Sequence, residues 1–405
     1  MNAQRIVLAS VLSISAALAS TAVHAVEVDA GDWKLSVSGN VNVHYIHSSC
    51  DDNDVTPVAG GLACIGAEGE DRSSSVSNGL LPAALVIGAS TTQKGYDIGV
   101  TFGLYPGIST NDGGSPNLGF GPGTNVALGT TGLDVRQVFL TFGNESMGTF
   151  TMGRTYGLFG FDAIVADMSI AGVGAGKGNY GAPANTSLGS IGLGYIYVDQ
   201  LAQIDYTTPD FNGVKVTVGI FDPVEPILQG EPTPKGAPGF HGKVAYTAGD
   251  LYLSATFLTQ KQEGLTAGLD YTSRAFDLGG KLKLGPVDLM AFYYAGKGVG
   301  TTGLFFNADD GLGNARDSDG FLAQATYTFG DTKVGINYGE SNLDLASGEA
   351  GSTLVESNSK YTVGIYHNLT PILNLLAEFS DVKAEAHNGV ENDSSSINVG
   401  AFVTF

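Results

Sequence analysis

The sequence predicts an all-β fold, a 16-stranded antiparallel transmembrane β-barrel with a long third loop folded into the lumen. Three observations support this prediction. Ile397 to Phe405 and Trp33 to Tyr45 alternate apolar with small or polar side chains, with Phe402 as the one large apolar exception. The connections between strand-like segments alternate between short and long. Alternation with a period of two indicates strands with unlike faces, and alternating connection lengths are typical of barrels in membranes. The last nine residues alone would equally fit an edge strand of a soluble sandwich.

The first 25 residues predict a secretory signal peptide. A single charge, Arg5, precedes an apolar run from Ile6 to Ala19, and Val23-His24-Ala25 forms a small-residue cleavage site. This order is typical of a segment that is removed on export. No later stretch approaches the roughly 18 uninterrupted apolar residues of a spanning helix, so we expect no transmembrane helix. The chain therefore divides into a signal peptide, residues 1–25, and a barrel domain, residues 26–405.

The composition is acidic. The chain has 40 Asp and Glu against 19 Lys and Arg, a formal net charge of −21 at pH 7. Basic residues form no patch, which argues against nucleic acid as a partner. An acidic surface attracts cations or faces lipopolysaccharide, although acidic loops can also serve solubility alone. The 59 glycines have no period, which excludes a collagen-like chain.

Two cysteines, Cys50 and Cys64, lie in an acidic, glycine-containing stretch. In an exported protein we expect them to form a disulfide that pins one loop. A shared metal ion is less favoured because no histidine lies between them, and thiol catalysis is less favoured again. We predict neither a metal site nor a cofactor.

The strand pattern starts at Trp33 to Tyr45, with Lys34 and Asn40 on the polar face. Seven tight turns each join two β-rich runs: residues 93–95, 144–148, 210–213, 248–250, 285–286, 330–332 and 368–371. Eight longer or more polar connections are centred near residues 60, 118, 172, 230, 267, 308, 349 and 388. Together they join sixteen strands. Aromatic residues near the run ends predict two interfacial girdles: Tyr96, Tyr105, Phe139, Phe142, Tyr206, Phe257, Phe292, Tyr293, Tyr294, Phe321, Tyr327 and Phe329.

The third long connection, residues 155–188, is rich in glycine but also carries apolar groups: Phe159, Phe161, Ile164, Val165, Met168 and Ile170. A solvated outer loop has little use for so many of them. A loop folded against the inner wall would bury them, and sixteen strands leave a lumen wide enough to hold it. We therefore expect this loop to narrow a channel.

Three segments carry a family resemblance. The first is a strand, Arg136-Gln-Val-Phe-Leu-Thr-Phe142 with the later Gly153-Arg154. The second is the start of a constriction loop, Gly153 to Gly157 with Asp162 and Asp167. The third is the following strand and turn, Ile204 to Gly213. Together with Phe405 at the end they resemble the trimeric, sixteen-stranded general diffusion porins of Gram-negative outer membranes. The resemblance implies an outer-membrane location, contacts with lipid and lipopolysaccharide, a homotrimer, and recognition of Phe405 by the barrel-assembly machinery.

The resemblance also implies a pore constriction. In the family, acidic groups on the loop face basic groups on the wall, and fixed opposite charges across a narrow lumen filter solutes by charge and size. By position, Asp167 matches a loop carboxylate and Arg136 a wall arginine. Asp162 lies at the root of the loop, and Arg154 matches a position that can take part in subunit contacts. The predicted pore-constriction residues are these four together with Asn40 and Lys34 on the first strand.

This chain departs from the family pattern at several positions. Ser169 to Gly174 lacks the second loop carboxylate, and Asn40 stands where relatives can carry Lys, on the same face as Lys34. The second strand has no lumen arginine, and the sixth offers Asp199, Gln203 and Asp205. The basic ladder is thinned, which predicts a weakly selective or cation-preferring channel.

The predicted function is passive diffusion of small hydrophilic solutes and ions. The alternative is a substrate-specific channel, for instance for organic acids or phosphate, which would need more lumen arginines. A hydrolase or an adhesin built on a barrel is less favoured. No Gly-x-Ser-x-Gly or other nucleophile motif occurs, so we do not expect an enzyme.

Overall fold

A computed structural model describes residues 25–51, 57–65, 71–108, 133–176, 186–224, 236–263 and 269–405. The predicted signal peptide falls, apart from Ala25, outside the described residues. The strands are β1 Val26–Ala30, β2 Trp33–Cys50, β3 Arg72–Ser77, β4 Ala84–Gln93, β5 Tyr96–Pro106, β6 Leu133–Asn144, β7 Gly148–Tyr156, β8 Gln200–Thr207, β9 Val214–Phe221, β10 Gly239–Ala248, β11 Leu251–Gln262, β12 Tyr271–Leu284, β13 Val287–Lys297, β14 Asp317–Phe329, β15 Thr332–Leu343, β16 Val355–Thr370, β17 Leu373–Ala386 and β18 Glu391–Thr404.

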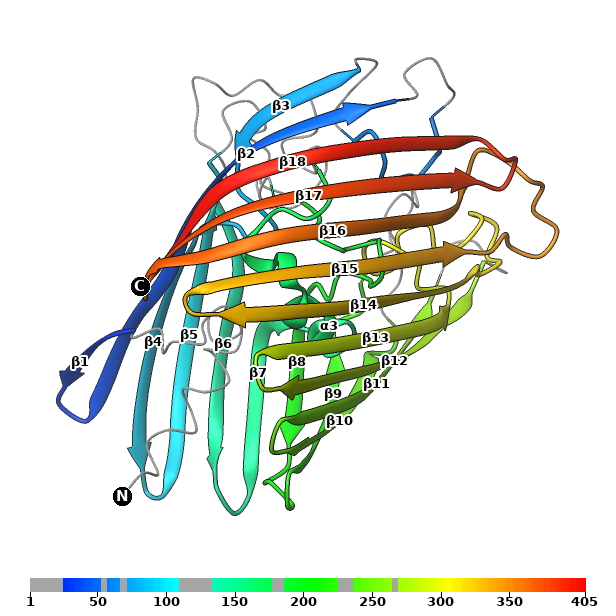
Figure 1. Cartoon of the computed structure of the whole chain (residues 1–405). Helices are drawn as coiled ribbons and strands as arrows, with labels where there is room; N and C mark the ends of the chain where they lie inside the picture. Colours follow the sequence, from blue (N-terminus) through cyan, green and yellow to red (C-terminus); the bar gives the residue numbers. More distant parts are fainter. Residues whose placement is uncertain are drawn as a thin grey trace.

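The strands form one closed antiparallel barrel (Figure 1). Each strand from β4 to β18 pairs with the next, and β18 closes the ring on β2, with Val399 opposite Tyr45 and Val403 opposite Val41. The eighteen strand segments form sixteen strands of the barrel. β3 and β4 pair with successive parts of β2 and together count as one strand, and β1 pairs with β2 as a hairpin that adds no strand to the ring. The predicted fold class is therefore confirmed.

The connections follow the predicted alternation with one difference. Short turns join strands at one end of the barrel and longer connections join them at the other, here called the loop end. The connection expected near residue 388 is short, residues 387–390. Strands β17 and β18 run on to it because their pairing continues without a break to Glu385 opposite Glu391.

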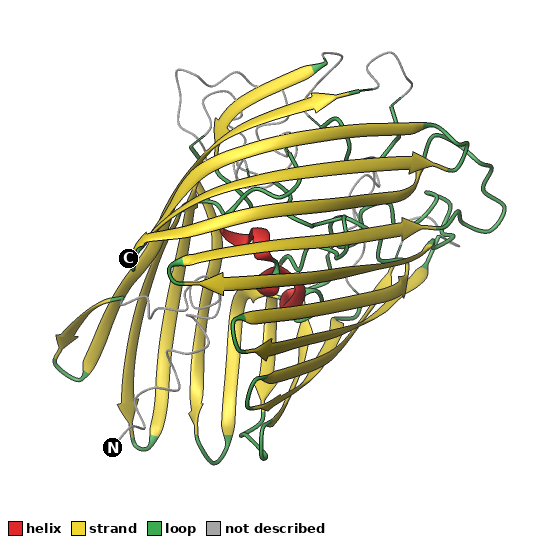
Figure 2. Ribbon diagram, viewed as in Figure 1, coloured by secondary structure: helices red, strands yellow, loops and turns green. Residues whose placement is uncertain are grey.

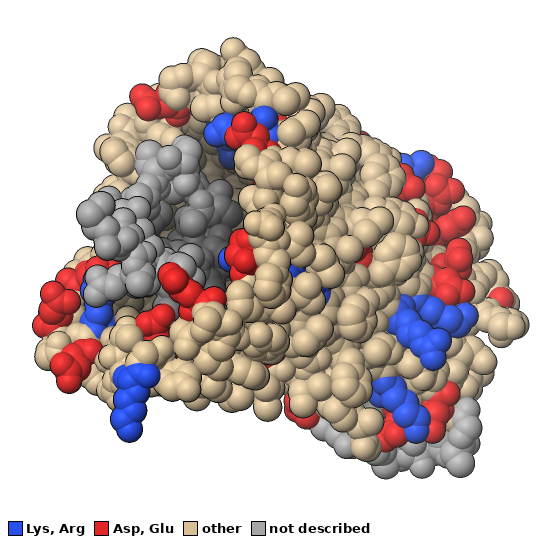
Figure 3. Space-filling model, turned by 90° about the horizontal axis from the view of Figure 1, so that it is seen from below, with Lys and Arg blue, Asp and Glu red and all other residues tan. Residues whose placement is uncertain are grey.

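The wall has an apolar outside and a polar inside. On β2, Leu35, Val43 and Tyr45 are 41%, 41% and 48% exposed, whereas Asn42 and His44 between them are buried. Lipid covers the outward residues of a membrane barrel, so apolar exposure on this face is expected. Figure 3 shows uncharged side chains over the middle of the wall, with Lys, Arg, Asp and Glu toward its ends.

The girdle prediction is right for some aromatic residues and wrong for others. Tyr96, Phe257, Tyr293, Tyr327 and Phe329 are exposed on the outside. The side chains buried inside are Tyr105, Phe139, Phe292 and Tyr294. Neighbouring strand residues point to opposite faces, so three consecutive aromatic residues on β13 cannot all face lipid.

In the part of the chain that the structure describes, helical structure is confined to a short stretch inside the barrel. Helix α3, Phe161–Ala166, and the 3-10 turn η3, Met168–Ala171, lie within the ring of strands (Figure 2). Among the described residues, no helix is long and apolar enough to cross a membrane.

Candidate functional site

The connection between β7 and β8, residues 157–199, is here called the constriction loop. Its described parts, residues 157–176 and 186–199, fold into the lumen as predicted. Phe159 and Ile170 are buried in a cluster that includes Phe292, Tyr294 and Leu322 of the inner wall, and Met168 is also buried. The loop begins two residues after the predicted start, because Thr155 and Tyr156 still belong to β7. Residues 189–199 also pack inside the barrel, with Tyr195 and Val198 fully buried. The loop therefore occupies part of the lumen cross-section.

Asp167 is buried and ties the two arms of the constriction loop together. Its Oδ1 accepts hydrogen bonds from the backbone N–H of Ser169 at 2.9 Å and from Nδ2 of Asn337 at 3.3 Å. Its Oδ2 accepts from the backbone N–H of Ser190 at 3.1 Å and from the Tyr195 hydroxyl at 3.0 Å. The predicted loop carboxylate thus lies in a hydrogen-bond network between loop and wall. No described hydrogen bond or ion pair joins it to Arg136.

Two charged residues of the wall bind the same loop. Lys360 on β16 is 1% exposed, and its Nζ donates to the Gly189 carbonyl at 2.7 Å and to Ser190 Oγ at 2.8 Å. Glu378 on β17 accepts from the backbone N–H groups of Val173 at 2.8 Å and Gly174 at 2.9 Å. Charge-assisted hydrogen bonds of this kind are stronger than neutral ones. Sequence reasoning missed both residues, although each stands at an inward position of its strand.

Asp162 lies in the first turn of α3 and pairs with the wall. Its Oδ1 accepts from Lys243 Nζ at 2.8 Å and from the Tyr252 hydroxyl at 3.0 Å. Just before the helix, the backbone N–H of Gly160 donates to Oδ2 of Asp277 on β12 at 2.8 Å. The root of the loop is therefore fixed to β10, β11 and β12.

Arg136 faces inward but is enclosed by other side chains. A register shift opposite Gly103 bulges β6, so that both Arg136 and Gln137 turn to the inside. The guanidinium lies 3.4 Å from an Asp134 carboxylate oxygen, donates to the Tyr197 hydroxyl at 3.4 Å, and sits over the Tyr105 ring at 5.4 Å. Because Tyr197 belongs to the constriction loop, Arg136 anchors the end of that loop.

The other three predicted pore residues lie elsewhere. Arg154 is exposed and stands opposite Val138, which is 39% exposed, so it is on the outer face of the wall. Lys34 pairs with Glu27 of the β1–β2 hairpin at 2.9 Å, near the turn end. Asn40 faces inward, where its Oδ1 accepts from Asn42 at 3.0 Å. The structure does not gather these residues with Asp162 and Asp167.

Further basic residues of the wall lie on β10, β12, β15 and β16, where no pore residue was predicted. Besides Lys243 and Lys360, Lys281 on β12 sits over the Tyr252 ring at 5.3 Å, and Lys333 on β15 over the Tyr366 ring at 4.6 Å. Among the described residues, neither Lys281 nor Lys333 has an ion pair. Successive side chains of a strand point to opposite faces, so both lysines could be assigned to the inner face once one inward residue of each strand was known.

Two further connections also turn inward at the loop end. Residues 298–316, between β13 and β14, bury Val299 and Phe305, and the Thr302 carbonyl accepts from the backbone N–H of Tyr197 at 2.8 Å. Residues 57–65, between β2 and β3, are closed by the Cys50–Cys64 disulfide, which confirms that prediction. An inward course was predicted from the sequence for neither connection.

A buried histidine completes the inner wall. His241 on β10 reaches across β9 and places Nε2 2.8 Å from Oδ1 of Asp205 on β8. The crossing requires a glycine at 219, where an added Cβ would lie 1.7 Å from that same oxygen. The pair therefore links β8 to β10 across β9.

The comparisons with known proteins point to one family. The sequence family described as Gram-negative porin matches residues 9–387. No curated protein matches the chain. Among solved structures, the outer membrane channel DcaP of Acinetobacter baumannii is similar at 15% identity, with a TM-score of 0.69, over 94% of this chain and 99% of that one.

Two other solved structures are similar at lower TM-scores. OmpF of Salmonella typhi, solved with daunomycin, shares 14% identity and a TM-score of 0.59 over 94% of this chain and 100% of its own. OmpT of Vibrio cholerae shares 14% identity and a TM-score of 0.57 over the same fractions. At such identities the likeness shows the fold alone.

Proposed function

This chain belongs to the Gram-negative porin family, and we propose that its narrowed lumen passes small hydrophilic solutes and ions with a weak preference for cations. It is a multi-stranded β-barrel channel of the bacterial outer membrane. The matched family supports a diffusion channel and not an enzyme. The size limit and the charge preference are the parts proposed here.

The observation that carries the size limit is the fixation of the constriction loop. Asp167, Lys360 and Glu378 hold it to the wall through hydrogen bonds of 2.7 to 3.3 Å. A loop bound by buried charges on three elements keeps one position, because releasing it would leave those charges without partners. We propose that the remaining passage excludes large solutes. Swelling of liposomes in sugars of increasing size measures the limit, and unhindered passage of large oligosaccharides would contradict it.

The charge preference follows from the inner wall. Asp97, Asp134, Asp205, Asp277, Asp288 and Glu378 stand at inward positions of their strands. Lys243 neutralises the loop carboxylate Asp162, Arg136 pairs with Asp134, and Lys360 is buried against the loop. The positive charges of Lys281 and Lys333 offset part of the negative charge of the inner wall, so we propose a weak and not a strong preference for cations.

Reversal potential under a KCl gradient in a planar bilayer tests the preference. We expect a modest cation preference that increases in Lys281→Gln and in Lys333→Gln, because each change removes a positive charge from the inner wall. Lys94→Gln, in the exposed turn between β4 and β5, is the matched control and should leave the potential unchanged. A clear anion preference of the unmodified channel would overturn the proposal.

A second candidate, a channel selective for organic acids or phosphate, draws support from the same two lysines. Lys281 and Lys333, each over a tyrosine ring, offer positive charge to an anion. Single-channel conductance in KCl with added dicarboxylate or phosphate separates the candidates. Ohmic conductance without solute block favours general diffusion, and saturable block favours the selective channel.

The proposal extends to the assembly of the channel. We propose a homotrimer in outer-membrane lipid and lipopolysaccharide, inserted by the barrel-assembly machinery through Phe405. In support of the last point, the backbone of Phe405 pairs with Gly39 on β2 through N–H to O bonds of 2.9 and 3.1 Å, which places the final residue at the seam. Conductance that rises in three equal steps, and a trimer by native mass spectrometry, are the expected results.

A further inference from the structure

We infer that the first connection at the loop end, residues 57–65, is a second pore-narrowing element, which the Cys50–Cys64 disulfide holds against the constriction loop. This inference rests on the proposed channel function. It concerns a segment for which no inward position was predicted from the sequence. The support comes from the wall contacts, the loop contacts and the covalent closure of this segment.

The segment lies on the inner wall of the barrel. The backbone N–H of Leu62 donates to Asn358 Oδ1 on β16 at 2.8 Å, and that of Val58 to Asn392 Oδ1 on β18 at 2.8 Å. Ala59 accepts from the Val355 N–H at 2.9 Å. Asn358 and Asn392 stand at inward positions of their strands, so the segment is inside the ring and not above it.

The packing is as close as that of a core. Val58 and Leu62 are buried in a cluster with Val382 and Ala384 of β17. A Cβ placed on Gly61 would lie 2.9 Å from the Ala384 methyl group, so only a residue without a side chain allows this approach. A buried apolar contact in the mouth of a barrel stabilises the inward position because it removes both surfaces from water.

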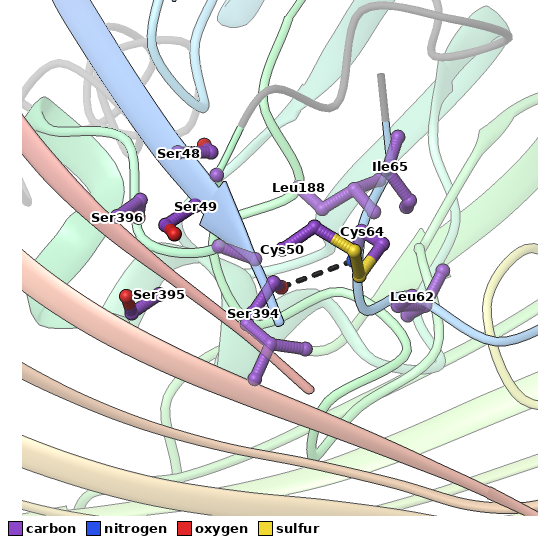
Figure 4. Close-up of a pocket in the computed structure, with 13 residues that line it drawn as sticks. Ser48, Ser49, Cys50, Leu62, Cys64, Ile65, Leu188, Ser394, Ser395 and Ser396 are labelled. Atoms are coloured by element: carbon purple, nitrogen blue, oxygen red, sulfur yellow. Dashed lines mark hydrogen bonds between the residues drawn. A yellow bond between two sulfur atoms is a disulfide. The ribbon is translucent and has the colours of Figure 1, made fainter. Parts of the chain in front are cut away.

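The same segment touches the constriction loop. Leu62 packs in one cluster with Ala175 and Leu193 of the constriction loop, and Leu188 lies against it. Figure 4 shows Leu188 and Ile65 beside the disulfide, across from the serines of β18. The space left between them is a cavity of about 20 Å³, room for about one water molecule.

All three inward segments meet at Gly192. A Cβ on this residue of the constriction loop would lie 2.6 Å from Leu62 Cδ1 and 2.7 Å from Thr302 Oγ1. The three connections therefore interlock at one point inside the lumen. A displacement of residues 57–65 removes one of the surfaces that hold the constriction loop.

The disulfide limits how far residues 57–65 can move away from the wall. It joins the last residue of β2 to Cys64, two residues beyond Leu62, with a sequence separation of 14. Cys64 is also tied to β18, where its backbone N–H donates to Ser394 Oγ at 3.0 Å. A covalent link at the end of β2 keeps Leu62 close to the wall, whereas the open chain could leave the mouth of the barrel at a smaller cost.

The test records single-channel conductance and liposome swelling of the full chain with and without dithiothreitol. The reductant is oxidised to its cyclic disulfide, while Cys50 and Cys64 take up two electrons and two protons as thiols, which a thiol assay confirms. Reduction should raise the conductance and its noise and shift the size limit to larger sugars. The double variant Cys50→Ser/Cys64→Ser should show the same shift and no response to the reductant.

Leu62→Ala addresses the contact without touching the disulfide, and should shift the size limit in the same direction. Leu312→Ala, a leucine that is 69% exposed in the connection between β13 and β14, is the matched control and should not. Unchanged conductance and sugar limit in the reduced channel and in the double cysteine variant would overturn this inference while leaving the channel function intact. A wild-type protein that forms no channel would instead overturn the proposed function.

Discussion

Replacing Asp167 by alanine is the sharpest test of how the lumen is narrowed. The change leaves the Ser190 N–H and the Tyr195 hydroxyl, which donate to Asp167 at 3.1 and 3.0 Å, without their acceptor inside the protein. A hydrogen bond to a charged group contributes about 1.5–3 kcal/mol, so the two bonds together contribute about 3–6 kcal/mol. Two other bonds to this carboxylate are left out of the sum. The bond from the Ser169 N–H at 2.9 Å is local to the same turn, and the bond from Asn337 at 3.3 Å is long.

This loss shifts the equilibrium between the packed and the released constriction loop by a factor of about 10² to 10⁴, since about 1.4 kcal/mol corresponds to a factor of ten. Hydrogen exchange followed by mass spectrometry measures it, because the Ser190 amide is itself one of the donors. We expect its protection to fall by that factor in Asp167→Ala, with noisier single-channel current. The barrel should still assemble, because the sheet pairing does not involve this residue.

Asp310→Ala is the matched control, because that carboxylate accepts hydrogen bonds only within its own turn among the described residues, from Leu312 and Asn314. In Asp310→Ala, the rate of amide hydrogen exchange at Ser190 should equal that of the unmodified protein. Equal protection and equal current noise in Asp167→Ala would refute the reasoning, and would show that the other wall contacts suffice to hold the loop.

Two further predictions concern the wall and the loop end. Gly219→Ala should break the bond between Asp205 and its buried histidine partner and lower the stability of the barrel by about 1–3 kcal/mol, measured as a lower urea midpoint. Gly351→Ala, where the nearest atom to an added Cβ is 3.8 Å away, is the control and should leave the midpoint unchanged. Equal midpoints in the two variants would contradict a stabilising link between β8 and β10. Hydrogen bonds from Arg316 hold the pKa of Glu349 below its ordinary value, so this pair stabilises the loop end fully above the ordinary pKa and loses that contribution as the pH falls through the lower folded pKa. Amide exchange at Ala346, which donates to Glu349, should therefore accelerate in that acidic window, and a flat profile would contradict it.

The strands were readable from the sequence because their signal is local. Alternation in Trp33 to Tyr45 reflects two faces in contact with lipid and with the lumen, and a strand shows this wherever it sits in the ring. The inward constriction loop was also predictable, since Phe159 and Ile170 need a buried environment that an outer loop does not offer. The disulfide could be predicted from the expected export of the chain and from its number of cysteines, because an exported chain with two cysteines has one possible pairing.

The pore residues were harder to predict, for a physical reason. Parity tells which side chains of a strand face inward, but not which of them the loops then cover. Asp167 and Arg136 were expected across an open constriction, yet Asp167 binds Ser190 and Tyr195, and a bulge turns Arg136 into a group of tyrosines. Arg154 was placed at the pore although its position in β7 directs it outward.

The sequence by itself determined the class of protein, the strand pattern, the disulfide and the inward third loop, because each depends on periodicity or composition within a short stretch. Only the tertiary structure decided that Lys360 and Glu378 hold that loop, and that Leu62, Gly192 and Thr302 meet in the lumen. These contacts join residues more than a hundred positions apart. They arise when the ring closes and brings the inner faces of distant strands and loops to one point, which no pattern within a segment encodes.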